Sequence, residues 1–455
     1  MLHPERVSRL NEAPVRPDGR YVLYWMQQAQ RAHGNHALEL AITLGNELAR
    51  PVIVAFGLTD DYPEANERHY AFMLEGLAET AAALERRRLR LVLRRGSPER
   101  VAIGLEGDAA LIVCDVGHLR HQRAWRRSVA AAAGCQVLAV ETDLVVPLAT
   151  ASDKLEVAAR TLRPKLHRQL DRFLVPLEEQ EPVRSSLDLE LPGDADPRAV
   201  DDLLASLRID RSVGRVRRFR GGLAEARRRL ARFVAQALPG YGAGRSDPAA
   251  PRCSELSPYL HFGQIAPLEV ALAVRQAAAA AREDRASFLE ELIVRRELAH
   301  NFVAHCQDYD GYAGVPEWAR RTLAAHAGDV RAHLYDEAAL VEGRTHDRYW
   351  NAAMREMRET GYMHNYMRMY WGKKILEWSR SPEEALATAL RLNNRYFLDG
   401  RDANSYTGVA WCFGRHDRPW AERPIFGTVR YMNAAGLERK FAIDAYVRWT
   451  ETLAP

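Results

Sequence analysis

The chain is poor in cysteine. Its 455 residues include only five cysteines, and these are scattered with no Cys-x-x-Cys pair. An odd number of isolated cysteines argues against a disulfide framework. We therefore expect the thiols to be reduced and inert.

Long apolar runs are missing as well. No stretch approaches the roughly eighteen consecutive apolar residues of a membrane-spanning helix. The first residues, Met-Leu-His-Pro-Glu-Arg, lack the apolar centre of a signal peptide. We expect a soluble, intracellular (cytoplasmic) monomer with no membrane partner.

Neither sign of charge is in large excess. The chain has 64 Lys and Arg against 60 Asp and Glu, so its formal net charge of +4 does not by itself indicate nucleic acid. Basic residues concentrate in 211–229, at Lys373-Lys374 and in 415–418, the last beside Trp411, Phe413 and Trp420. Arginines among aromatics suit a surface that grips phosphates and stacks bases. A solvated helix face is the alternative, and we favour it for 211–229.

The usual nucleotide motifs are absent. No Gly-x-Gly-x-x-Gly follows the first predicted strand and there is no Walker loop, so the sequence does not support NAD or ordinary nucleoside triphosphate chemistry. The run Arg31-Ala-His-Gly-Asn-His36 resembles a nucleotidyl-transferase signature, but its spacing is wrong. We interpret His33 as a loop residue and His36 as a helix start, and predict no metal site.

Hydrophobic periodicity divides the chain into two parts. In the first part, short apolar runs alternate with helical patterns, which predicts an α/β domain with a doubly wound, largely parallel sheet. In the second part, almost every pattern is helical. We predict an α/β domain over 1–177, a linker over 178–210 and an all-helical domain over 211–455. The expected strands are 21–26, 52–58, 89–93, 110–116 and 137–140, and the helical patterns are 36–49, 67–88, 97–105, 118–133, 222–237, 265–282, 286–306, 347–359, 362–378 and 381–392.

Three tryptophans stand out in the helical part. Trp371 and Trp378 are seven residues apart, which on a helix means two turns and one face, and Trp350 lies on the preceding helical run. Their spacing alone favours ordinary core packing.

The neighbours of these tryptophans suit a flavin. Arg368, Asp399 and Asp402 flank them, and carboxylates can accept from the N–H groups of a flavin ring while a guanidinium stabilises its reduced, anionic form. Upstream, Cys253–Gln264 supplies hydroxyls and N–H groups ahead of the apolar run 265–273. That helix start could accept a pyrophosphate, although most such caps bind nothing.

Several long motifs resemble the DNA photolyase/cryptochrome family, and most closely its class II cyclobutane pyrimidine dimer photolyases. The resemblance extends from Tyr21-Val-Leu-Tyr-Trp-Met-Gln-Gln28 to Arg430-Tyr-Met-Asn433 and thus covers nearly the whole chain. The motifs are Ser254-Glu-Leu-Ser-Pro-Tyr-Leu-His-Phe-Gly-Gln264, Phe288-Leu-Glu-Glu-Leu-Ile-Val-Arg-Arg-Glu-Leu298, Met363-His-Asn-Tyr-Met-Arg-Met-Tyr-Trp371, Lys374-Ile-Leu-Glu-Trp378 and Leu398-Asp-Gly-Arg-Asp402.

The resemblance implies a light-driven enzyme that repairs pyrimidine dimers in DNA with noncovalent, reduced anionic FAD. Asn393 would face the flavin N5 atom, with a helix-ending Asn as the plainer interpretation. The tryptophans would carry electrons, with Trp371 nearest the flavin and Trp378 most exposed. An antenna pigment, a deazaflavin or a folate, would occupy the α/β domain. The implied FAD-binding residues are Tyr241, Ser254, Leu256, Ser257, Arg368, Asp399, Asp402 and Asn393.

The resemblance also assigns a dimer pocket. Glu291 would hydrogen-bond the dimer, although a surface i, i+4 pair with Arg295 is the commoner role of such a Glu. Met369 would pack against the dimer, or else simply fill the core. The implied DNA-binding residues are Arg245, Trp411, Trp420, Asn365 and Arg418.

Two positions depart from the family pattern, and two rival functions remain. Class II relatives often carry Gly in place of Asn365, and some carry an aromatic in place of Arg295. A cryptochrome-like photoreceptor without repair activity is the main rival; we expect repair instead because the chain ends at Pro455, soon after the last motif, without a long effector tail. An electron-transfer flavoprotein or nucleotide-binding enzyme built on the sheet alone would leave the helical part unexplained.

Overall fold

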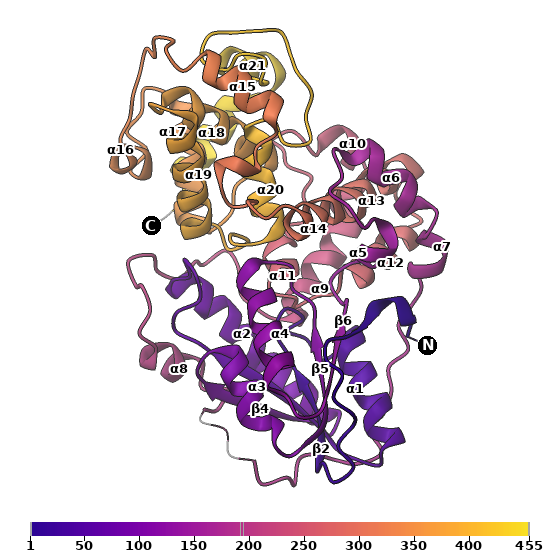
Figure 1. Ribbon diagram of the computed structural model, residues 1–455. Helices are drawn as coiled ribbons and strands as arrows, with labels where there is room; N and C mark the ends of the chain where they lie inside the picture. Colours follow the sequence, from indigo (N-terminus) through magenta and orange to yellow (C-terminus); the bar gives the residue numbers. More distant parts are fainter. Residues whose placement is uncertain (1, 192, 194, 454–455) are drawn as a thin grey trace.

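The computed structural model describes residues 2–191, 193 and 195–453. A six-stranded sheet with flanking helices forms one part of the molecule, and a larger helical part lies against one end of it (Figure 1). This arrangement confirms the predicted fold class.

The sheet has the strand order β1-β6-β5-β2-β3-β4. Strands β2 to β6 pair in parallel, and their predicted positions are confirmed within about two residues; every residue of β2, β3 and β5 is buried, as in a parallel sheet covered on both faces. The short edge strand β1 pairs antiparallel with β6, and three residues are too few to give a periodic signal. The strands are β1 (Val7–Arg9), β2 (Tyr21–Trp25), β3 (Val52–Leu58), β4 (Arg90–Arg95), β5 (Ala109–Asp115) and β6 (Gln136–Val140).

The helices that cover this sheet begin close to where the sequence predicts. Asn35 accepts hydrogen bonds from the N–H groups of Ala37 and Leu38, so it is the cap of α1. His36 is accordingly the first helical residue, and His33 lies in the preceding loop beside Glu179, as expected. The elements of this part are η1 (Pro4–Arg6), α1 (His36–Glu47), α2 (Glu67–Arg86), α3 (Pro98–Glu106), α4 (Arg120–Ala132) and α8 (Val200–Ser206), the last within the segment predicted as a linker. The short helices α5 (Leu148–Ala151), α6 (Ala159–His167) and α7 (Leu170–Phe173) follow β6 in the chain but lie against the helical part (Figure 1).

The helical part contains two π-helical segments that the sequence pattern does not predict. Residues 286–306 read as one continuous helix, yet the structure divides them into α13, η3 and α14. Such π-segments are frequent at functional sites because they redirect side chains. The elements are α9 (Leu223–Arg232), η2 (π, Phe233–Ala237), α10 (Tyr241–Gly244), α11 (Ser257–His261), α12 (Pro267–Gln276), α13 (Arg282–Leu289), η3 (π, Glu290–Arg295), α14 (Arg296–His305), η4 (Tyr312–Gly314), α15 (Glu317–Ala325), α16 (Glu337–Val341), α17 (Arg348–Thr360), α18 (Asn365–Trp378), α19 (Pro382–Tyr396), α20 (Ala403–Cys412), α21 (Ala434–Lys440) and α22 (Ile443–Glu451).

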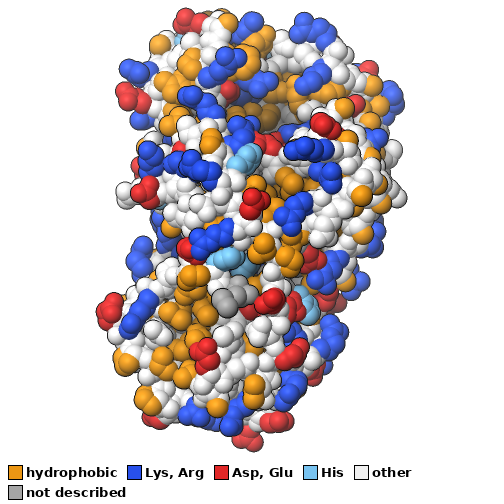
Figure 2. All heavy atoms as spheres, turned by 90° about the vertical axis from the view of Figure 1, so that its right-hand side faces the viewer, with side chains coloured by type: hydrophobic (Ala, Val, Ile, Leu, Met, Phe, Trp, Pro, Cys, Tyr) orange, Lys and Arg blue, Asp and Glu red, His pale blue; other side chains and the backbone are white. Residues whose placement is uncertain are grey.

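Several basic residues that look like surface in the sequence are buried in the structure. Arg229 is 5% exposed and pairs with Glu225 and Glu255, so the expectation that 211–229 is a solvated face is wrong for this residue. Lys373 is fully buried and donates to the carbonyl of Cys412. On the face drawn in Figure 2, the remaining Lys and Arg side chains are interspersed with acidic and apolar ones and form no single basic patch.

No helix of the described residues is both long enough and apolar enough to cross a membrane.

Candidate functional site

A cavity of about 570 Å³ opens in the helical part, within the usual range for a cofactor site. Helices α18, α19 and α20 contribute to its wall, together with the π-segment η3 and the 253–257 turn. Most of the residues assigned by the resemblance line it: Tyr241, Arg245, Ser254, Leu256, Ser257, Glu291, Asn365, Arg368, Met369, Trp371, Asn393, Asp399, Asp402 and Trp411.

A bidentate ion pair forms part of the cavity wall. The two guanidinium nitrogens Nη1 and Nη2 of Arg368 each lie 3.0 Å from an oxygen of Asp399. The guanidinium also stacks 3.9 Å from the centre of the Phe397 ring. This fork fixes a cationic group at the cavity in one orientation.

Asp402 is a buried carboxylate at the cavity. Burial alone would raise the pKa of its carboxyl, but His261, His300 and Arg296 outweigh that effect and hold the pKa well below its usual range. Its nearest ring nitrogen, Nδ1 of His261, lies 3.9 Å from Oδ1. Oδ2 accepts from Nδ2 of Asn404 at 3.0 Å, and the charged Oδ1 remains available as an acceptor.

The serine segment has a different local structure from the one predicted. Glu255 adopts a left-handed backbone (φ 56°), and Ser257 then opens the short helix α11 instead of preceding the helix of the apolar run 265–273. Arg218 and Arg229 both pair with the Glu255 carboxylate. These pairs hold the turn in place, so that Ser254 and Ser257 line the cavity.

The π-segment decides which acid faces the cavity. Glu291 lines it and pairs with Arg245 at 2.8 Å, whereas Glu290 pairs with Arg163 at 2.7 Å. The alternative interpretation, in which Glu291 is a surface residue paired with Arg295, is therefore wrong. Arg295 contacts Glu290 and lies over the ring of Trp411 at 5.2 Å, so it forms a further wall of the cavity.

Asn393 lies inside a helix and not at its end. It is 4% exposed within α19, whose last residue is Tyr396, so the capping interpretation is wrong. One amide N–H donates to Oδ1 of Asn394 at 3.0 Å, which fixes the amide plane beside the cavity.

The three tryptophans lead away from the cavity. Trp371 lines it, and its indole N–H has no hydrogen-bond partner among the described residues. Nε1 of Trp350 donates to the carbonyl of Trp371 at 3.1 Å, and the rings of Trp350 and Trp378 lie 5.6 Å apart. Trp378 is the most exposed of the three, but only 3% of it is exposed. The series of three tryptophans therefore ends below the surface.

Two residues assigned to DNA lie outside the cavity. Trp420 is 40% exposed, with Arg418 at 5.2 Å and Arg430 at 4.9 Å from its ring. Of these three, only Arg430 lines the cavity, and the sequence reasoning missed it.

Three further residues that line the cavity were also missed, namely Arg296, Ser405 and Cys412. Their inward orientation depends on how α14 and α20 pack together, and sequence spacing carries no signal of that packing.

The cavity fits a flavin adenine dinucleotide on chemical grounds. It combines apolar walls, lining serines, a fixed guanidinium and a carboxylate that stays charged. The unpartnered N–H of Trp371 is a further donor beside it. A dinucleotide with a planar ring and a pyrophosphate needs these groups.

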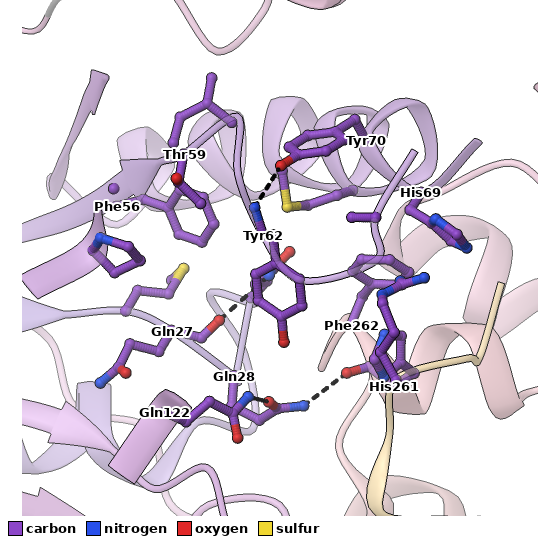
Figure 3. Close-up of a pocket in the computed structure, with 18 of the residues that line it drawn as sticks. Gln27, Gln28, Phe56, Thr59, Tyr62, His69, Tyr70, Gln122, His261 and Phe262 are labelled. Carbon is purple, nitrogen blue, oxygen red and sulfur yellow. Dashed lines mark hydrogen bonds between the residues drawn. The ribbon is translucent and has the colours of Figure 1, made fainter. Parts of the chain in front are cut away.

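A second, smaller cavity of about 80 Å³ lies where the sheet meets the helical part (Figure 3). Gln27 and Gln28 follow β2 and Thr59 follows β3, so the cavity opens at the carboxyl ends of parallel strands, the usual ligand position in such sheets. The ring of Tyr62 projects into its middle, and both amide atoms of Gln27 are buried without a partner among the described residues.

Comparisons with known proteins agree with this arrangement. The family model described as DNA photolyase matches residues 22–183. The chain is 49% identical to the deoxyribodipyrimidine photo-lyase of Methanothermobacter thermautotrophicus over 98% of both chains. The fold is similar to that of the class III photolyase of Agrobacterium tumefaciens (TM-score 0.74, 21% identity, covering 95% of this chain and 86% of that one). It is also similar to an archaeal photolyase from Sulfolobus tokodaii, described with two FAD molecules and a novel light-harvesting cofactor (TM-score 0.68, 18% identity, covering 94% and 89%). The chain therefore belongs to the DNA photolyase family.

Proposed function

We propose that this protein is a light-driven enzyme that repairs cyclobutane pyrimidine dimers in DNA, using FAD in the larger cavity, and that it is of the class II type. The observation that carries the proposal is a single cavity lined both by the fixed Arg368–Asp399 pair and by Glu291, next to a chain of tryptophans. The 49% identity to a deoxyribodipyrimidine photo-lyase, over nearly the full length of both chains, supports the same function.

The polar residues would bind and orient the cofactor. Ser254 and Ser257 would receive its phosphates, and Asp402 would accept hydrogen bonds from its ribityl chain or ring. Arg368, held by Asp399, would place positive charge near the ring, and the fixed amide of Asn393 would face N5. Tyr241 and Leu256 would pack against the cofactor. When bound and reduced, FAD supplies the single electron that splits a dimer under light.

The remaining cavity residues would receive a dimer flipped out of the helix. Extrusion of a poorly stacked base costs only a few kcal/mol, and photolyases act on flipped bases. Trp411 and Met369 would pack against the dimer, and Asn365 and Arg245 would contact it or its backbone. Trp420 and Arg418 would hold the flanking DNA through stacking and phosphate contacts.

Glu291 is the residue that we assign to stabilising the dimer as it gains charge. It reaches the cavity from η3, and its 2.8 Å bond to Arg245 fixes one of its oxygens. The carboxyl would lie against the carbonyl and N–H edge of the dimer. In its protonated form its O–H would donate to the carbonyl oxygen, and that hydrogen bond strengthens as the oxygen becomes negative.

The smaller cavity is the proposed position of an antenna pigment, a deazaflavin or a folate. Gln27 would supply hydrogen bonds to a heterocyclic edge, and Tyr62 would have to move because about 80 Å³ is too little for a tricyclic ring.

Illumination of the purified protein with a dimer-containing oligonucleotide tests the function. We expect a flavin absorption spectrum and light-dependent loss of dimers after reduction of the protein. A flavin spectrum with no dimer loss would instead favour the photoreceptor, and a protein without flavin would refute both.

A further inference from the structure

The long loop between α20 and α21, residues 413–433, carries Arg418 and Trp420, which we assign to the flanking DNA. The structure describes this loop in full, and none of its residues belongs to a helix or strand. Trp420 begins a tight turn within it, because its backbone N–H donates to the carbonyl of Thr428 at 2.8 Å. The position of the exposed Trp420 ring therefore depends on what holds the 420–428 turn in place.

The 420–428 turn has a backbone that the chain does not favour by itself. Ile425 has φ 70°, and a β-branched residue rarely adopts this left-handed region. Gly427 lies so close to α15 that a Cβ atom there would overlap Oγ1 of Thr322. That hydroxyl accepts from the N–H of Thr428 at 3.0 Å. A strained turn persists where the surrounding structure holds it, so the contacts with the end of α15 fix the shape of this turn.

His326, the first residue after α15, is the centre of these contacts. Its Nδ1 lies 2.6 Å from Oδ2 of Asp329, and its Nε2 lies 2.9 Å from Oε1 of Glu422. The same oxygen of Asp329 accepts from the N–H of Ile425 at 2.7 Å. The ring is thus connected to the turn directly at Glu422, and at Ile425 through Asp329.

Both ring nitrogens of His326 must donate in this arrangement. An ionised carboxylate only accepts, so each of the two contacts needs an N–H group, and a neutral imidazole has only one. The ring is therefore an imidazolium. The hydrogen bonds to Glu422 and Asp329 accordingly raise the pKa of His326 above its ordinary value of 6.5.

The neighbouring charges favour the same state. The N–H of Ile425, then the ring of His326 and Arg331, lower the pKa of Asp329, so this carboxylate stays ionised. Arg423, the basic residue of the turn, lies over the ring of Tyr431 at 4.0 Å instead. The imidazolium is therefore the cation that joins the turn to the end of α15.

We propose that His326 is a positioning residue for DNA binding, which holds the 420–428 turn between Asp329 and Glu422 and so places Trp420 for stacking on a base. The inference rests on the proposed role of this loop in binding DNA. A ring that loses a proton keeps one N–H for two carboxylates, so one contact is lost and the turn loosens. Because the pKa of the ring is raised in the folded protein, the linkage is complete at low pH and is lost as pH rises through that pKa.

Binding of a dimer-containing duplex in the dark tests this role, by fluorescence anisotropy at constant ionic strength from about pH 6 to about pH 9, which brackets a raised histidine titration. We expect the wild-type affinity to fall as pH rises. His326→Gln should bind roughly threefold to tenfold more weakly at the lowest pH, at most the loss of one stacked base, and should lose the pH step. Glu422→Gln removes the largest cause of the raised pKa, so its step should move to lower pH. His305→Gln, at an exposed histidine of α14, should match the wild type.

A double-mutant cycle separates positioning from a simple charge effect, because a positive charge near DNA would also strengthen binding at low pH. If His326 acts through Trp420, then His326→Gln should have no further effect on binding in a Trp420→Ala background. The pH step should be absent in that background as well. Additive effects of the two substitutions would overturn the inference.

A further readout needs neither DNA nor light. NMR of the His326 ring should show both nitrogens protonated at neutral pH and a titration above 6.5, and the amides of the 420–428 turn should exchange faster in His326→Gln. A ring that titrates at or below 6.5, or wild-type binding that does not change with pH, would overturn the inference and leave the proposed function standing. A wild type that binds no dimer-containing DNA at any pH would refute both.

Discussion

The substitution Glu291→Gln separates repair from binding. The amide keeps the size of the side chain, one acceptor and a donor group, but it removes the acidic proton that the assigned role uses. The pair that it weakens, with Arg245 at 2.8 Å, has side chains that are 26% and 32% exposed. Loss of such a partly solvated pair costs the fold only about 0.2–1 kcal/mol, so the variant should fold and bind damaged DNA nearly as well as the wild type.

The expected effect on repair is much larger. A charge-assisted hydrogen bond to the dimer is worth about 1.5–3 kcal/mol. If that bond strengthens only as the dimer becomes negative, its loss raises the barrier to ring opening and slows this step by roughly one to two orders of magnitude. Return of the electron without repair then competes, and fewer dimers are opened per absorbed photon.

The assay is the repair yield of chemically reduced enzyme on a dimer-containing oligonucleotide, which removes the tryptophans from the comparison. Glu290→Gln is the matched control because this neighbouring acid pairs with Arg163 and does not line the cavity. We expect a normal yield for the control. An unchanged yield in Glu291→Gln would refute the role assigned to Glu291.

Three further predictions follow from the structure. Trp371→Phe keeps an apolar ring in the cavity wall but is much harder to oxidise, so the protein should fold while photoreduction of oxidised FAD slows greatly; normal photoreduction would mean that the tryptophans are only core. Denaturation should release FAD into the supernatant, since noncovalent groups line the cavity, and flavin retained on the chain would contradict this. Burial raises the pKa of Glu297 to about 8 in spite of its hydrogen bonds from the N–H groups of Val145 and Val146. The folded state therefore holds this proton more tightly than the unfolded state, and the stability that it contributes below the ordinary pKa of 4.5 is lost as pH rises through about 8. The melting temperature of Glu297→Gln should fall less over this pH range than that of the wild type, and parallel curves would refute the assignment.

Sequence patterns and motifs predict the fold class and fourteen of the residues that line the larger cavity. Strands β2 to β6 and the long helices follow from hydrophobic period, because a buried parallel strand and an amphipathic helix leave local patterns in the chain. The motif resemblance gave fourteen residues that the cavity then brings together, from Tyr241 to Trp411.

The partner that each side chain takes depends on tertiary packing and is not encoded in a local pattern. Glu291 faces the cavity and Arg245 because a π-segment, invisible in the period of 286–306, rotates it away from Arg295. Lys373 is buried because α18 is covered on several sides. A lysine pair in the sequence is typical of a surface, so the sequence alone gives the wrong expectation for this residue. The contact of Tyr335 and His346 with Trp378 joins segments that are more than thirty residues apart. Such pairings depend on how helices pack in space, and a linear sequence pattern records only which residues are near one another along the chain.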